Sequence, residues 1–291
     1  MIVDDHRESL AMYAYGLLAM GFPSAMVRVV GTGDDLRLTA DLVASELAAD
    51  RAAGRKPGFV VATAGTTNTG AVDDLNGLAD LCTAEEMWFH VDGAYGAPAA
   101  LCDPGRRLLA GIERADSLVL DPHKWLFQPY DVGCLLVRRP GVLDAAFHMT
   151  PEYLLDVHGV TEEVDFRNRS LELSRRSRAL KIWLTFQTYG LDRISAAIER
   201  GMLLAEAAER MLRAHDRWEV VTPAQLGIVT FALRGADHGT HTARADRLGR
   251  DGHAAVTTTR LHGRSVLRLC TINPRTTEHD IATTLARLQT D

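Results

Sequence analysis

The sequence predicts an α/β protein with a mainly parallel sheet and flanking helices, followed by a small α+β domain. Short β-branched runs alternate with helical patterns in the first part of the chain, two long helical patterns follow, and strand-like runs return near the end. Alternating strands and helices are typical of parallel sheets covered by helices. We place the large domain at residues 1–185 and the small one at 186–291.

The first part contains four apolar runs that are expected to form strands. They cover residues 58–65, 87–93, 117–124 and 132–140. Between the first two runs, residues 73–82 place leucines at helical spacing after a pair of aspartates that can cap the helix. Residues 98–116 are helical in parts. This order supports a parallel sheet whose carboxyl edge would carry the chemistry.

The later part of the chain is organised differently. Helical patterns cover residues 174–190 and 194–215, after a long segment (148–170) of weak periodicity that reads as a functional or mobile loop. The tail predicts three strands and a closing helix, at residues 218–221, 228–233, 265–272 and 278–289.

Composition excludes several classes of function. The chain has 291 residues, 46% of them hydrophobic, and a net charge of −6, so nucleic acid is not an expected partner. Four scattered cysteines show no metal-binding spacing and favour a reduced, cytoplasmic protein. The acidic first residues do not resemble a signal peptide, and no apolar stretch is long enough to cross a membrane.

Two reactive side chains fall at predicted strand ends. Asp92 closes the second run, and Lys124, in "DPHKW", closes the third. A partly desolvated lysine amine can attack an aldehyde, and an aspartate can pair with a pyridinium nitrogen. This pair of groups is expected of a pyridoxal 5′-phosphate site. A purely structural role for the His-Lys-Trp tripeptide remains the alternative.

Six segments carry a resemblance to a known family. They are "DDHRES", "VATAGTTNTGAVDDL", "WFHVDGAYGAPAAL", "ADSLVLDPHKWL", "SRRSRALKIW" and "VLRLCTINPRTT". Together they resemble the group II pyridoxal-phosphate-dependent amino-acid decarboxylases, which include the aromatic-L-amino-acid and glutamate decarboxylases. The resemblance implies a fold-type I transferase-like architecture and pyridoxal phosphate as the cofactor.

The resemblance also implies residue roles. Lys124 resembles the Schiff-base lysine, and Asp92 resembles the partner of the pyridine nitrogen. The other matches are Ala94 and His6 on the two ring faces, Thr67 beside the cofactor, His123 near the phosphate, Tyr153 as a catalytic tyrosine in a mobile loop, and Ser174 as a hint of substrate specificity. A packing role for Tyr153 is the competing interpretation. In the family this loop crosses a dimer interface, which implies a homodimer.

The function implied is decarboxylation of an L-amino acid to the amine and CO2. An aromatic substrate is favoured, and Ser174 favours a tyrosine- or dopa-like substrate over tryptophan, because the matching position in plant relatives resembles serine where the substrate is phenolic and glycine where it is indolic. The alternatives are an aldehyde-forming decarboxylase–oxidase or an aminotransferase on the same scaffold, and an inactive fragment that needs a partner chain.

Two departures from the family pattern stand out. Asp121 occupies a position where several relatives have asparagine, and its carboxylate would repel a phosphate unless it points elsewhere. The chain also begins almost at His6, without the preceding phosphate-binding loop and dimerisation region. We therefore expect an N-terminally truncated chain that binds the cofactor weakly by itself.

Overall fold

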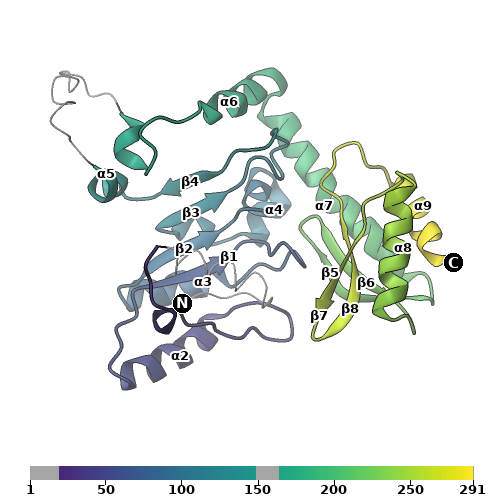
Figure 1. The fold of residues 1–291 in the computed structure, drawn as a ribbon, viewed down its shortest axis with the longest axis horizontal. Helices are drawn as coiled ribbons and strands as arrows, with labels where there is room; N and C mark the ends of the chain where they lie inside the picture. The colour runs from purple at the N-terminus through teal and green to yellow at the C-terminus, as the bar shows by residue number, and fades with distance from the viewer. Residues whose placement is uncertain (1–19, 149–163, 291) are drawn as a thin grey trace.

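The computed structural model describes residues 20–148 and 164–290 and contains two four-stranded sheets joined by a long helix (Figure 1). The first sheet has the order β1-β2-β3-β4, and the second has the order β5-β6-β8-β7. A mainly parallel sheet with flanking helices and a smaller α+β part is thus confirmed. The predicted division at residues 185/186 falls inside a helix, and its position stays a prediction.

In the first sheet three parallel strands are followed by one antiparallel strand. The strands are β1 (Phe59–Thr63), β2 (Trp88–Asp92), β3 (Ser117–Leu120) and β4 (Cys134–Val137). β1 pairs with β2 and β2 with β3 in parallel, whereas β4 runs antiparallel to β3. The parallel strands read as continuous β-branched and apolar runs because helices cover them, as is typical of α/β sheets.

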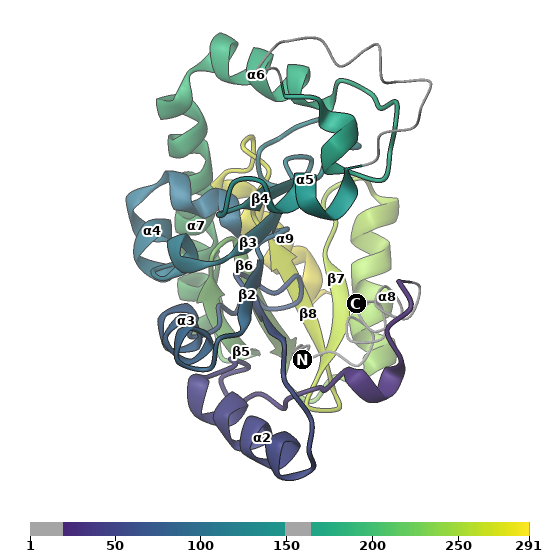
Figure 2. The same ribbon diagram turned by 90° about the vertical axis from the view of Figure 1, so that its left-hand side faces the viewer.

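The helices of the first part lie before, between and after these strands. They are η1 (Ser24–Met26), α2 (Ala40–Ala52), α3 (Leu75–Ala84), η2 (Ala97–Leu101), α4 (Asp103–Leu108), η3 (Ile112–Arg114) and α5 (Val142–Phe147). Asp74 caps α3 by accepting a hydrogen bond from the Gly77 N–H at 3.1 Å. Figure 2 shows α3 and α4 on one side of β2 and β3, where α3 buries Leu78 and Cys82.

The second part consists of long helices and an antiparallel sheet. After η5 (Phe166–Arg169) come α6 (Arg178–Tyr189), α7 (Leu191–Arg213), β5 (Trp218–Gln225), β6 (Ile228–Leu233), α8 (His238–Arg250), β7 (Thr257–Leu261), β8 (Arg264–Cys270) and α9 (Glu278–Gln289). Its core forms around Phe231, Leu267 and Ile281. A capping box between Thr277 and Asp280 begins α9.

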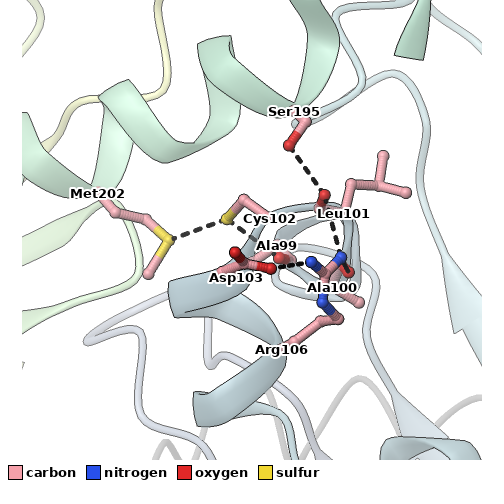
Figure 3. A network of polar contacts seen from close by, with 8 residues as sticks. All are labelled: Ala99, Ala100, Leu101, Cys102, Asp103, Arg106, Ser195 and Met202. Carbon is pink, nitrogen blue, oxygen red and sulfur yellow. Dashed lines mark hydrogen bonds and ion pairs between the residues drawn. The ribbon is translucent and has the colours of Figure 1, made fainter. Parts of the chain in front are cut away.

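Helix α7 connects the two cores. Ile194, Ile198 and Met202 belong to the core of the first sheet, whereas Leu204 and Leu212 belong to that of the second. Figure 3 shows the polar side of this junction. The Ser195 hydroxyl donates to the Leu101 carbonyl at 2.8 Å, and the Cys102 Sγ lies 3.7 Å from the Met202 Sδ. The second part is therefore bonded directly to the loops that follow β2.

None of the helices in the described part of the chain is long and apolar enough to cross a membrane.

Candidate active site

The carboxyl edge of the first sheet brings the ends of three strands together. Asp92, the last residue of β2, is in register with Thr63 of β1 and with Val119 of β3. The loops that follow these residues therefore leave the sheet side by side. Three of the predicted site segments, at residues 64–70, 92–94 and 121–124, lie in these loops.

Asp92 is buried at this edge. The residue is only 8% exposed, and its Oδ1 accepts a hydrogen bond from the Ala94 N–H at 2.9 Å. The Gly93 N–H donates to the Val119 carbonyl at 2.9 Å, and the Asp121 N–H donates to the Ala94 carbonyl at 3.1 Å. These two bonds tie the turn after β2 to the turn after β3.

Lys124 lies in the second of these turns and is half-buried. Its Nζ lies 3.0 Å from the Asp121 Oδ2, and its side chain is 35% exposed. The Lys124 N–H also donates to the Asp121 carbonyl at 2.8 Å, which closes a tight turn. The Asp121 carboxylate thus points toward the lysine amine. Its negative charge is paired with Lys124, so the aspartate in place of asparagine is accounted for without a carboxylate aimed at a phosphate.

His123 is fixed by the loop that precedes β4. Its Nδ1 lies 2.7 Å from the Val132 carbonyl and 3.2 Å from the Val132 nitrogen, and its Nε2 lies 3.8 Å from the Asp121 Oδ2. Asp121 therefore lies close to both predicted site residues of the "DPHKW" segment.

Thr67 lies at an exposed turn after β1. The turn is closed by its neighbours, because the Thr66 and Thr69 hydroxyls are 2.8 Å apart and the Gly70 N–H donates to the Thr66 carbonyl at 2.9 Å. Since β1 ends opposite Asp92, Thr67 projects from the same edge of the sheet as Lys124. The structure thus brings Asp92, Ala94, Lys124, His123 and Thr67 to one edge.

The other predicted residues are not assembled there in the same way. His6 and Tyr153 lie outside the described residues. Ser174 is exposed, in the segment between η5 and α6. That segment helps to line an apolar cavity of about 1200 Å³ next to β4 and α5, but Ser174 is not among its lining residues. The specificity role of Ser174 stays a prediction.

His90 shares a face of β2 with Asp92 but belongs to the interior. Its Nδ1 lies 2.7 Å from the Ser117 hydroxyl, which also accepts a hydrogen bond from the Trp88 indole N–H at 2.8 Å. Burial lowers the pKa of His90. Burial therefore favours the neutral form of this partly buried histidine, which pairs with Ser117.

Helix α6 contributes a lysine that the sequence did not single out. Lys181 donates from its Nζ to the Pro129 and Asp131 carbonyls, at 2.8 and 2.9 Å, and so holds the loop between Lys124 and β4. The backbone N–H of Asp131 and the Arg178 guanidinium lower the pKa of the Asp131 carboxyl. Arg176 and Arg178 lie 3.6 and 3.4 Å from the Asp131 carboxylate and form an ion-pair face beside α6.

The residues at this edge fit the cofactor expected from the sequence. Lys124 presents a primary amine that reaches solvent, and Asp92 presents a buried carboxylate one strand away. The first suits an aldehyde carbon and the second suits a protonated ring nitrogen. No rearrangement of the strands is needed to bring the two groups to one edge.

Comparison with known proteins agrees with this geometry. The profile described as "Pyridoxal-dependent decarboxylase conserved domain" matches residues 6–234. The chain is 46% identical over 281 residues to an aromatic-L-amino-acid decarboxylase of Bacillus atrophaeus, an alignment that covers 94% of this chain and 58% of that protein. This chain thus spans somewhat more than half of that relative's length.

Two solved structures share the fold. Oryza sativa TDC with PLP and tryptamine has a TM-score of 0.89 and 31% identity, over 99% of this chain and 61% of that one. Catharanthus roseus tryptophan decarboxylase in complex with L-tryptophan has a TM-score of 0.87 and 30% identity, with the same coverage. The prediction of a fold-type I architecture is confirmed. On the strength of its matched domain and its relatives, this chain belongs to the pyridoxal-dependent decarboxylase family.

Proposed function

We propose that this chain carries the lysine–carboxylate site of a pyridoxal-phosphate-dependent carboxy-lyase that converts an aromatic L-amino acid to its amine and CO2. One observation carries the proposal. The Lys124 amine and the buried Asp92 carboxylate follow adjacent parallel strands, and hydrogen bonds join their turns. The aromatic substrate is supported by the names of the relatives, which are aromatic-L-amino-acid and tryptophan decarboxylases.

Each residue at the edge has a defined task in this proposal. Lys124 would hold the cofactor by its aldehyde carbon and release it to the substrate amine. Asp92 would keep a proton on the pyridine nitrogen, and Ala94 would pack against one face of the ring. When bound, the cofactor supplies a ring that accepts the electron pair left by the departing carboxylate.

Three further residues would complete the site. His123 would lie near the phosphate, with its ring orientation fixed by the backbone of Val132. Thr67 would lie beside the cofactor on the loop after β1. Tyr153, outside the described residues, would return a proton to the substrate Cα, and His6, likewise outside them, would stack on the second ring face.

We further propose that the protein works as a homodimer in the cytoplasm, with the active site at the interface. A second copy is supported by the apolar surface of α6 and the segment before it, where Leu171, Leu173, Trp183 and Tyr189 are all exposed. In Figure 1, α6 lies at an outer end of the molecule. The cytoplasm is supported by the cysteines, all four of which are free.

The test is a product assay with saturating cofactor. The chain is incubated separately with L-tryptophan, L-tyrosine, L-dopa and L-glutamate, and amine, aldehyde and CO2 are measured. We expect amine and CO2 in equal amounts from the aromatic substrates and none from L-glutamate. Aldehyde as the main product would contradict plain decarboxylation, and equal rates with L-glutamate would contradict the aromatic preference. Sedimentation of the same sample reports the dimer.

A further inference from the structure

Two buried aromatic rings lie directly next to the predicted site residues. Tyr95 follows Ala94, and Trp125 follows Lys124. Both side chains are almost fully buried, and their rings stack with a centroid separation of 5.2 Å and an interplanar angle of 9°. Each ring is covalently one residue away from a group that would contact the cofactor. The ring pair therefore connects the turn after β2 with the turn after β3.

The ring pair adds a constraint that the backbone bonds of the two turns do not supply. The bond from the Asp121 N–H to the Ala94 carbonyl joins the two turns, and the bond from the Lys124 N–H to the Asp121 carbonyl lies within the second turn alone. Neither bond ties residue 124 itself to the turn after β2. The indole of Trp125, 0% exposed and stacked on Tyr95, does so, because a buried planar ring has few alternative rotamers.

Leu226 packs in the same hydrophobic core as the ring pair. The turn between β5 and β6 places Leu226 at φ 52°, a left-handed conformation, with the residue 2% exposed. A non-glycine residue keeps such a conformation where its surroundings determine it. Leu226 reaches Gly65 and Gly96, where an added Cβ would come within 2.5 and 2.7 Å of its Cδ1. These glycines leave just enough room for the Leu226 side chain.

Two glycines, Gly227 next to Leu226 and Gly201 within α7, pack against the rings. A Cβ on Gly227 would lie 3.1 Å from the Tyr95 hydroxyl oxygen and 3.4 Å from the Trp125 ring, and one on Gly201 of α7 would lie 3.3 Å from the same ring. The Thr271 hydroxyl donates to the Gly201 carbonyl at 2.7 Å and lies 3.2 Å from the Gly227 carbonyl, which fixes both glycines. The ring pair is thus enclosed by backbone on the side away from the site.

We propose that the Tyr95–Trp125 stack, held in place by Leu226, is the positioning element that fixes Lys124 relative to Asp92. This rests on the proposed function, in which these two residues hold opposite ends of one cofactor ring. Sites of this kind need their groups held to within about 0.5 Å by packed neighbours. Tyr95, Trp125 and Leu226 would act through Lys124 and Asp92 without touching the cofactor.

The experiment compares variants that remove a ring with variants that keep it. Tyr95→Leu and Trp125→Leu abolish the stack, whereas Tyr95→Phe retains the ring. Leu226→Ala shortens the side chain and leaves both rings in place. Phe231→Leu perturbs the separate core of the second sheet and serves as a control for general loss of stability, because Phe231 is fully buried away from the stack.

Three measurements are made on the folded fraction of each variant of the 291-residue chain. The first is the affinity for pyridoxal phosphate, with borohydride reduction and peptide mass spectrometry to show attachment at Lys124. The second is the induced circular dichroism per mole of cofactor attached, which reports ring orientation. The third needs no cofactor: the rate of reductive methylation of Lys124 by formaldehyde, relative to that of the exposed Lys56 in the same chain.

Loss of the stack should weaken cofactor binding on the order of tenfold, equivalent to about 1.4 kcal/mol. It should also reduce the induced dichroism at saturation and change the Lys124-to-Lys56 methylation ratio several-fold. Leu226→Ala should move the same readouts less, and Tyr95→Phe and Phe231→Leu should leave them within about twofold of wild type.

Unchanged affinity, dichroism and methylation ratio in folded Tyr95→Leu would overturn the inference. If neither ring-deleting variant folds, Leu226→Ala decides by the same criteria. If the wild-type chain attaches no cofactor at Lys124, the proposed function fails instead, and the methylation ratio still shows whether the stack positions the lysine.

Discussion

The two sheets of this protein contrast in where they keep their polar side chains. In the first sheet, Asp92, Asp121 and Lys124 gather at the carboxyl edge, where the Lys124 and Asp121 side chains face each other and reach solvent while Asp92 is buried. In the second sheet, Thr230 is fully buried and its hydroxyl lies 2.7 Å from that of Thr222. Beside that sheet, the buried Arg244 of α8 donates to the Leu288 carbonyl of α9 at 2.7 Å. One sheet presents its polar groups, and the other pairs them internally.

The difference follows from strand direction. Parallel strands need crossover connections, so their carboxyl ends open into independent loops at one edge. Antiparallel strands such as β5 and β6 return through short turns, and their ends are closed by the chain itself. The contrast predicts that substitutions in the first sheet change chemistry at little cost in stability, and that substitutions in the second do the reverse.

The largest effect is expected from Lys124→Ala. The chain has three lysines, of which Lys181 already binds two carbonyl oxygens and Lys56 is exposed. Borohydride reduction should therefore attach no pyridoxal phosphate to the variant, while wild type and the control Lys56→Ala are labelled equally. Mass spectrometry of the reduced peptides measures this. Cofactor attached to another lysine in the variant would show that the site has been misplaced.

Asp92→Asn should separate binding from turnover. The asparagine Oδ1 can still accept the hydrogen bond from the Ala94 N–H, so the turn is kept and only the charge is lost. We expect attachment of cofactor at Lys124 to stay within about twofold, and amine formation to fall on the order of 10²-fold. Kinetics and borohydride labelling of the same preparation measure both.

The matched control is Asp116→Asn at the opposite end of the same strands. The Asp116 Oδ2 accepts a hydrogen bond from the Phe89 N–H at 2.9 Å, which an asparagine oxygen can also accept. This control should retain normal turnover. Equal losses in the two variants would mean that Asp92 acts through the fold and not through the cofactor.

Thr277→Ala should affect only the second part of the molecule. Thr277 and Asp280 form the capping box at the start of α9, and loss of an N-cap hydroxyl costs about 1 kcal/mol. Urea unfolding should show this loss, with cofactor attachment at Lys124 unchanged, and Thr277→Ser should restore the stability. A parallel drop in cofactor attachment would contradict the proposed independence of the site on the first sheet from the stability of the second sheet.

The sequence predicted more of the candidate site than of the helices and strands around the second sheet. Asp92 and Lys124 were expected together because both close apolar runs, and parallel strands align such ends at one edge. Helix α8 and strand β7 were missed, because α8 turns His241 and Arg244 inward and β7 begins with three threonines. The buried face of α8 mixes polar with apolar side chains and β7 buries only Leu261, so hydrophobic periodicity does not reveal them.

Contacts between side chains could not be predicted from the sequence for a different reason. The pairing of Asp121 with Lys124 depends on a turn that directs both side chains the same way, which spacing alone does not specify. The stack of Tyr95 on Trp125 joins residues 30 positions apart and depends on the register of β2 against β3. Sequence motifs locate the reactive groups, whereas the packing that orients them depends on the tertiary fold.

The smallest expected effect comes from acid and compares the buried His241 with the partly buried His90. His241 in α8 accepts a hydrogen bond at its Nε2 from the Leu233 N–H at 3.1 Å, and only an unprotonated nitrogen can accept it. Burial lowers the pKa of His241, helped by the positive charges of Arg264 and Arg244, against the opposing charge of Asp237. His90, whose pKa burial also lowers, instead faces a Ser117 hydroxyl that can rotate to accept from it.

Both histidines bind a proton more readily in the unfolded chain than in the folded one. Stability should therefore be fully present above about pH 6.5 and should decrease as pH falls below it toward the folded-state pKa. Because His241 would also lose its backbone bond, His241→Gln should flatten the pH dependence of the unfolding free energy more than His90→Gln does. Urea titrations between pH 5 and 8 measure these slopes, with His262→Asn as an exposed control at a left-handed position that asparagine tolerates. A slope that His241→Gln leaves unchanged would assign the acid sensitivity to other groups.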